Sequence, residues 1–174
     1  MREVVIDSEW SGFDHNKDYI IEVCCLEIVD RQLSQKKFHS YVKPPVSLSN
    51  EVSENTGIGN KFLSDKPPFA EIVDPLLAFI GDGRLISHGI SLELDFLNAE
   101  LKRLAKPPFL VSDMFDTVTF LREKFPDLPA SLDPVSERYE LTMPSDQDPG
   151  PGYCESDAWL TAQLYLKLCE DFGL

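Results

Sequence analysis

Short runs of apolar residues in the N-terminal quarter of the chain predict β-strands. Residues 4–6 are β-branched and end at an acidic residue, whereas residues 19–29 are apolar almost without interruption. Residues 37–42 alternate with the two-residue period of a strand. We expect residues 30–32 to form a hairpin turn. Pro44 and Pro45 should end the sheet, because proline cannot donate a ladder hydrogen bond.

The rest of the chain alternates between helical and strand-like patterns. Apolar residues spaced by three or four positions predict helices over residues 69–80, 92–104, 116–125, 131–139 and 155–171. Short strands are expected at residues 84–87 and 109–111, and residues 142–152 should form a loop rich in proline and glycine. This order predicts an α/β fold with a mixed five-stranded sheet flanked by helices. No long linker divides residues 1–174, so we expect one domain.

Composition narrows the class of protein. The chain has 43% hydrophobic and 26% charged residues, which are ordinary values for a globular domain. No apolar run approaches the roughly 20 residues of a membrane span, and the chain reaches Asp7 too early for a signal peptide. We therefore expect a cytoplasmic protein with no membrane partner. The four cysteines lack metal-binding spacing and are interpreted as reduced, mostly buried thiols.

The net charge of −14 argues against a broad basic surface for nucleic acid. A nucleic-acid enzyme remains compatible with this charge, because bound divalent cations can supply local positive charge. Tight, sequence-specific binding of a duplex is not expected.

Asp7 and Glu9 form the first candidate site. They lie two residues apart at the end of a strand, so their carboxylates point the same way. Like charges held side by side are unfavourable unless a cation neutralises them. Gly12 follows and permits a tight turn. The spacing alone leaves two alternatives open, a metal site or a pair of solvated acids.

The surrounding residues resemble a known family. Asp7-Ser8-Glu9-Trp10-Ser11-Gly12 is similar to D-x-E-T-T-G, the first motif of the DnaQ-like (DEDD) 3′–5′ exonucleases. The similarity includes residues 20–23, 38–44, 57–58, 62–72, 131–133 and 138–141, and is closest to the proofreading epsilon subunits of bacterial DNA polymerase III. The resemblance implies a ribonuclease H-like, DnaQ-like exonuclease fold.

The second family motif, H-N-x-x-F-D, departs from the pattern in this chain. Its register from His88 places Glu93 where the family has a metal-binding aspartate. The extra methylene of glutamate moves the carboxylate by about 1.5 Å, one C–C bond length. Asp95 lies two residues later and would need a local shift to substitute, so either acid could serve.

The third family motif, H-x-A-x-x-D, lacks its histidine here. Asp157 matches the final metal ligand, but the position of the general-base histidine is Gly152. Tyr153 and Asp157 fit the Y-x-x-x-D spacing of a sister branch, in which a tyrosine positions the attacking water. The alternative for Tyr153 is a loop aromatic that covers the helix start.

The resemblance also suggests substrate-binding residues. These are Trp10, Gly12, Gly57 and Ile58. Trp10 could stack on a terminal base, or it could be a partly buried aromatic. Asp116 matches a further acid near the family's site, but it could equally cap its helix. His88 is expected to be structural.

Taken together, the resemblance implies hydrolysis at the 3′ end of single-stranded DNA or RNA, with DNA favoured. Two Mg²⁺ or Mn²⁺ ions would be held by Asp7, Glu9, Glu93 and Asp157. Without the histidine base, the expected activity is weak and improves with Mn²⁺ or raised pH. The alternative is a catalytically impaired module that binds nucleic acid or a protein. No tail follows the last helix, so no polymerase partner is implied.

Overall fold

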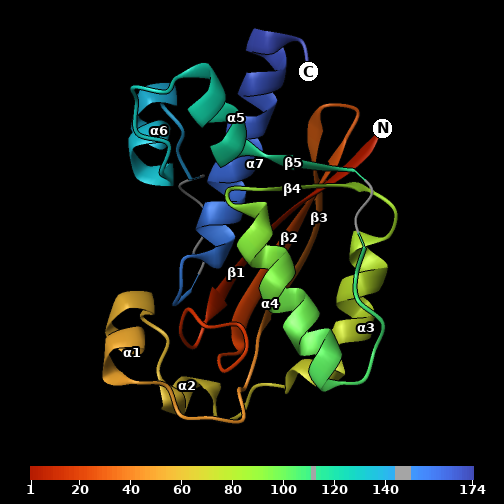
Figure 1. Cartoon of the computed structure of the whole chain (residues 1–174), viewed down its shortest axis with the longest axis vertical. Coiled ribbons are helices and arrows are strands. Elements are labelled where there is room, and N and C mark those ends of the chain that lie inside the picture. The colour runs from red at the N-terminus through yellow and green to blue at the C-terminus, as the bar shows by residue number, and fades with distance from the viewer. Residues whose placement is uncertain (111–112, 144–149) are drawn as a thin grey trace.

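The computed structural model describes residues 1–110, 113–143 and 150–174. At its centre is a five-stranded sheet with the order β3-β2-β1-β4-β5 (Figure 1). The strands are β1 (Arg2–Trp10), β2 (Ile20–Val29), β3 (Gln32–Tyr41), β4 (Arg84–Ser87) and β5 (Met114–Asp116). The first three strands pair antiparallel, whereas β4 runs parallel to β1 and β5 runs parallel to β4. The mixed five-stranded sheet is therefore confirmed.

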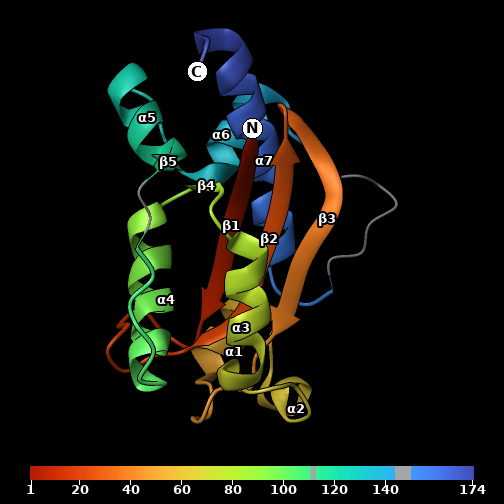
Figure 2. The same cartoon turned by 90° about the vertical axis from the view of Figure 1, so that its right-hand side faces the viewer.

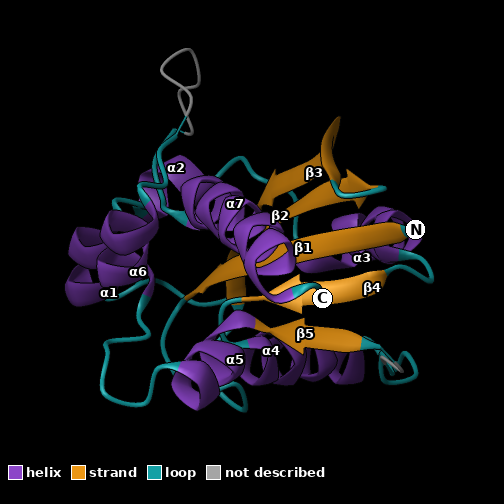
Figure 3. Cartoon of the chain, turned by 90° about the horizontal axis from the view of Figure 1, so that it is seen from above, coloured by secondary structure: helices purple, strands orange, loops and turns teal. Residues whose placement is uncertain are grey.

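Helices cover both faces of the sheet (Figures 2 and 3). α3 (Phe69–Ile80) and α4 (Ile90–Arg103) lie on one face, and α7 (Cys154–Phe172) lies on the other. The remaining helices are α1 (Asn50–Thr56), α2 (Asn60–Leu63), α5 (Thr117–Lys124) and α6 (Leu132–Tyr139). None of the described helices combines the length and apolar character of a membrane-spanning segment.

The two-residue period of the central strands divides the core into two layers. Val4 packs with apolar residues of α3 and α4, whereas its neighbour Val5 packs with Tyr165 and other residues of α7. Cys24 and Cys25 are divided between the same two layers, as their adjacency predicted. All four cysteines are free thiols. Consecutive residues of β1 and β2 therefore face different helices, which positions the site described below.

The hairpin between β2 and β3 forms where the sequence predicted it. Asp30 and Arg31 have φ values of 50° and 64°, so they make the tight turn. β3 begins at Gln32, earlier than residue 37, because the polar residues that follow the turn lie in an edge strand exposed to solvent. The short helices α1 and α2 were not expected, since neither is long enough to show an apolar face in the sequence.

The strand predicted at residues 109–111 is wrong. Phe109 and Leu110 are not in a strand, residue 111 lies outside the described residues, and β5 is formed by Met114–Asp116. Phe109 is fixed to α4, where its backbone N–H donates to Asn98 Oδ1 at 2.7 Å. Phe109 packs against the core, whereas Leu110 is 84% exposed, and a run of three apolar residues is too short to identify a strand. In the predicted loop 142–152, residues 144–149 also lie outside the described residues.

Candidate active site

The predicted acidic pair, Asp7 and Glu9, lies near the end of β1, beyond the residues that pair with β4. β4 pairs with residues 3–5 of β1 and then diverges, whereas β2 stays paired along the rest of β1. Asp7 and Glu9 point to the face that α7 covers, and Ser8 points to the opposite face, toward α4. The antiparallel register places Glu22 of β2 directly opposite Glu9.

The first turn of α7 supplies a third acid, Asp157, whose charge raises the pKa of both Asp7 and Glu9. Two further contacts hold the start of this helix against β1. The backbone N–H of Tyr153 donates to Glu9, and Cys154 Sγ donates to the Asp7 carbonyl at 2.9 Å. The side chain of Tyr153 is 55% exposed. The structure therefore brings the first and third motifs together.

Glu93 lies near Asp7 but belongs to α4, a helix on the other face of the sheet from α7. It lies in the first turn of α4, is 5% exposed, and accepts a hydrogen bond from Ser8 Oγ at 2.5 Å. Its charge raises the pKa of Asp7. Asp95 instead lines a polar pocket with His15 on the outer side of α4. Of the two acids that the sequence left open, Glu93 is the one beside Asp7.

Burial and repulsion from nearby carboxylates raise the pKa of each carboxyl group in this cluster. Burial is the largest cause for each of them, and it raises the pKa of Glu9 to about 7, of Glu93 to about 8 and of Asp157 to about 6. Burial, together with the charge of Glu93, raises the pKa of Asp7 well above its usual range. Divalent cations relieve such crowding, and carboxylate oxygens are the hard ligands that Mg²⁺ and Mn²⁺ prefer. The donor set therefore fits a divalent metal.

Over residues 1–110, 113–143 and 150–174, no group of three or more His, Cys, Asp or Glu side chains is already arranged to hold a metal ion. Glu93 directs one carboxylate oxygen to Ser8.

The raised pKa values predict that rising pH destabilises the protein when divalent cations are removed. These carboxyl groups bind protons more tightly in the folded chain than in the unfolded chain, where their pKa is about 4. Their favourable contribution to the free energy of unfolding is complete below about pH 4. It is lost as the pH rises to about 8, the pKa of Glu93. We expect a lower melting temperature at pH 8 than at pH 5 in EDTA, and recovery at pH 8 with Mn²⁺.

Scanning calorimetry at the two pH values, with EDTA or Mn²⁺, measures this effect. A Glu93→Gln variant controls for the general acidity of the chain, because it removes one of the raised groups and should lose less stability between pH 5 and pH 8. Equal losses in the variant and the unaltered protein would contradict the assignment.

Another acid fills the position of the missing histidine. Gly152 has a φ of +96°, and an ideal Cβ on this residue would lie 2.0 Å from Glu22 Oε2. Glu22 is fully buried, its Oε1 is hydrogen-bonded to His39 Nε2 at 2.7 Å, and its charge raises the pKa of Glu9. The sequence pattern identified Glu22 only as part of a strand. Its signal was an acid, one of two with Glu27, inside an otherwise apolar run.

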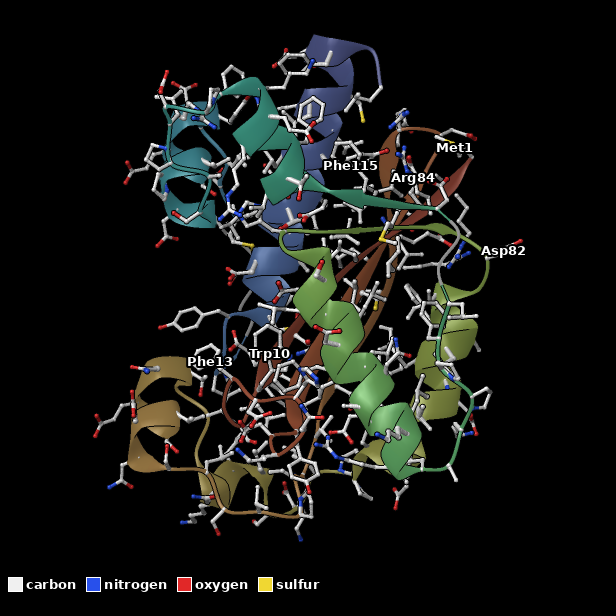
Figure 4. The ribbon with its side chains drawn as sticks, viewed as in Figure 1. Met1, Trp10, Phe13, Asp82, Arg84 and Phe115 are labelled. Carbon is white, nitrogen blue, oxygen red and sulfur yellow. The ribbon has the colours of Figure 1, made fainter. Side chains whose placement is uncertain are left out.

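Trp10 is held by contacts within the protein. Its ring stacks on Phe96 with centroids 4.5 Å apart and an interplanar angle of 5°, and its Nε1–H donates to Ser8 Oγ at 2.8 Å. Of the two interpretations given for Trp10, these contacts match that of a partly buried aromatic. Phe13, which sequence reasoning missed, is 85% exposed and lies edge-on to Trp10 with centroids 6.4 Å apart (Figure 4). A large aromatic in a polar loop just after the acidic motif was the signal.

The glycines and the isoleucine predicted to contact substrate have clear local roles. A Cβ on Gly12 would lie 2.4 Å from Asp18 Oδ2, and the same oxygen accepts from the Asp14 backbone N–H at 2.9 Å to close the β1–β2 loop. Gly57 ends α1 with a φ of +70°, and Ile58 is fully buried. Contacts of these residues with substrate stay predictions.

Asp116 and His88 join the ends of three elements. Asp116 Oδ1 caps α5 by accepting from the Val118 backbone N–H at 3.1 Å, and it also accepts from the Gly89 N–H at 3.0 Å. His88 Nδ1 is hydrogen-bonded to Thr117 Oγ1 at 2.8 Å. The helix-cap alternative for Asp116 is therefore confirmed, and His88 has the structural contact expected of it.

Comparison with known proteins agrees with this geometry. The exonuclease family model RNase T matches residues 4–144. The DNA polymerase III subunit epsilon of Rickettsia typhi is 34% identical over 172 residues, which are 97% of this chain and 74% of that protein. The same subunit of Buchnera aphidicola subsp. Acyrthosiphon pisum is 34% identical over 174 residues, covering 96% of this chain and 72% of that protein.

Solved structures share the fold at low sequence identity. Exonuclease X in complex with 5′ overhanging duplex DNA has a TM-score of 0.75 and 18% identity, covering 98% of this chain and 93% of that chain. The nuclease domain of 3′hExo, a DEDDh family member bound to rAMP, has a TM-score of 0.78 and 17% identity, covering 98% and 92%. E. coli exonuclease I in complex with a dT13 oligonucleotide has a TM-score of 0.81 and 11% identity, covering 97% and 41%.

Proposed function

The chain belongs to the exonuclease family that the RNase T model describes, the DnaQ-like (DEDD) exonucleases, and from this premise we propose how its acidic cluster acts. The protein is a 3′–5′ exonuclease. The observation that carries the proposal is the meeting of Asp7, Glu9, Glu93 and Asp157 at the end of β1, although they come from three separate elements. Single-stranded DNA is the proposed substrate.

The reaction adds water to the phosphorus of the last phosphodiester. The bond to the 3′-oxygen of the preceding nucleotide breaks, and a nucleoside 5′-monophosphate leaves. When bound, two Mg²⁺ or Mn²⁺ ions would supply a more acidic water and charge neutralisation at the phosphate. The four carboxylates would hold these ions, and their raised pKa values in the absence of a cation are consistent with that role. Burial of the cluster strengthens each of these electrostatic interactions.

The group that handles the water proton differs from that of the histidine branch. The structure has Gly152 where the histidine would stand, and Tyr153 lies beside Glu9 at the start of α7. We propose that Tyr153 orients the water rather than deprotonating it, since a phenol hydroxyl is a poor proton acceptor. Loss of a general base costs about 10²–10⁴-fold in rate. Activity should therefore be weak and rise with pH or with Mn²⁺.

Release of nucleotides from a 3′-labelled single strand tests the function. We expect stepwise release that requires Mg²⁺ or Mn²⁺, stops in EDTA, and starts from the 3′ end only. A 5′-labelled strand tests the direction of hydrolysis, because the labelled strand should become shorter by one nucleotide at a time. Absence of release with either ion at any pH from 7 to 9 would favour the impaired binding module instead.

Phe13 is predicted to hold the terminal base. It is 85% exposed, follows the acidic motif and lies near Trp10 (Figure 4), and stacking on an aromatic contributes about 1–3 kcal/mol per base. Phe13→Ala should raise KM for a single strand by about tenfold with a smaller change in kcat. Leu128→Ala is the matched control, because Leu128 is also an exposed apolar residue but follows α5. An unchanged KM in Phe13→Ala would contradict the assignment.

A further inference from the structure

Two departures from the family motifs meet in one cluster. Trp10 replaces the threonine of D-x-E-T-T-G, and Glu93 replaces the aspartate of the second motif. These residues are 83 positions apart, yet both are hydrogen-bonded to Ser8 Oγ, at 2.8 Å and 2.5 Å. Phe96, one turn after Glu93 on α4, stacks on the Trp10 ring. The substituted residues therefore contact a common hydroxyl and a common helix.

The chemistry of the three groups sets the direction of these hydrogen bonds. An indole N–H can only donate, so Ser8 Oγ accepts from Trp10. The single proton of Ser8 is then directed to the Glu93 carboxylate, which accepts it at Oε2. Ser8 is 6% exposed and Glu93 is 5% exposed, so water does not readily replace either bond. The side chain of Glu93 is thus held at a defined position.

This arrangement explains how a longer side chain can occupy the second-motif position. Ser8 points to the α4 face of the sheet, on the opposite side of β1 from Asp7. Glutamate reaches Ser8 from the first turn of α4, whereas an aspartate would be about 1.5 Å shorter. A carboxylate has about four lone-pair sites, so the bond to Ser8 leaves others free for a cation beside Asp7.

We propose that Ser8 and Trp10 are positioning residues that hold Glu93 as the divalent-cation ligand in place of the family's aspartate. Trp10 is fixed by Phe96 and orients the Ser8 hydroxyl, and Ser8 in turn holds Glu93. The proposal rests on the proposed function, because it concerns the same metal site. It gives Trp10 a role inside the site that does not involve stacking on a base.

Calorimetric titration of the full chain with Mn²⁺ tests the proposal without measuring catalysis. Ser8→Ala should weaken Mn²⁺ binding by about tenfold, because Glu93 loses the Ser8 hydroxyl and keeps only its bond from the Ser8 backbone N–H. Ser8→Thr keeps the hydroxyl and should bind Mn²⁺ within about twofold of the unaltered protein. Trp10→Phe keeps a stacking ring without the N–H, and should show a smaller loss than Ser8→Ala.

Ser34→Ala is the matched control. Ser34 Oγ also donates to a buried glutamate on the neighbouring strand, Glu27, at 2.9 Å, but it lies in the β2–β3 part of the sheet near the hairpin. Its removal should leave Mn²⁺ affinity unchanged. Melting temperatures of all variants establish that each is folded at the titration temperature.

A double-mutant cycle separates positioning from a general effect on folding. In a Glu93→Asp background the carboxylate no longer reaches Ser8, so Ser8→Ala should change Mn²⁺ affinity by less than about twofold. Equal losses in both backgrounds, or full affinity in folded Ser8→Ala, would overturn the proposal. Mn²⁺ binding that depends on Ser8 and Glu93 in a protein without nuclease activity would support the positioning role while refuting the proposed function. Failure of the unaltered chain to bind Mn²⁺ would overturn both.

Discussion

Asp7→Asn should abolish nucleotide release and at the same time raise the melting temperature in EDTA. Asp7 is the acid whose pKa is raised by all three other members of the cluster as well as by burial. An amide keeps the shape of the side chain and removes both the desolvation cost and the repulsion. We expect a gain of roughly 1–3 kcal/mol in stability and a loss of at least about 10³-fold in rate.

Asp82→Asn is the matched control. Asp82 is an exposed acid in the turn between α3 and β4, far from Trp10 and Phe13 (Figure 4). The same change there should leave nuclease activity unchanged and shift the melting temperature little. Nuclease assays and calorimetry on both variants give the comparison. Release that persists in Asp7→Asn, or a melting temperature that falls, would refute the assigned site.

Gly152→His should fail to restore the histidine-dependent mechanism and should destabilise the protein. Alignment with the third motif suggests the opposite result, because it marks Gly152 as the histidine position. The Cβ of any side chain there would lie 2.0 Å from the buried Glu22 carboxylate, and the φ of +96° already disfavours residues other than glycine. We expect a loss of about 2–4 kcal/mol and no increase in nuclease rate.

Two alanine variants test whether the Cβ at residue 152 causes the loss of stability. Gly152→Ala carries the same Cβ and should show most of the same loss, whereas Gly59→Ala should be tolerated, because Gly59 has a negative φ and open space around its Cβ position. Unfolding in urea measures the differences in free energy. A stable Gly152→His protein with raised activity would show that Glu22 moves aside, and would overturn the account of the filled histidine position.

The contacts of Ser8, Trp10 and Glu22 show why local patterns were insufficient at the site. Each residue belongs to a strand that was expected from its apolar neighbours. The role of each comes from a partner far along the chain, namely Glu93 for Ser8, Phe96 for Trp10 and Gly152 for Glu22. No periodicity relates such partners, because their distance depends on how β1, β2, α4 and α7 pack.

The sequence by itself determined the α/β class, most of the strands and longer helices, and the acidic residues of the first and third motifs. Residues i and i+2 of a strand share a face, so Asp7 and Glu9 were a pair before any tertiary contact was known. The tertiary structure decided that Glu93 rather than Asp95 lies beside Asp7, because only Glu93 is on the side of α4 that faces the sheet. It also decided that Glu22 occupies the histidine position, because that requires β2 and the start of α7 to meet.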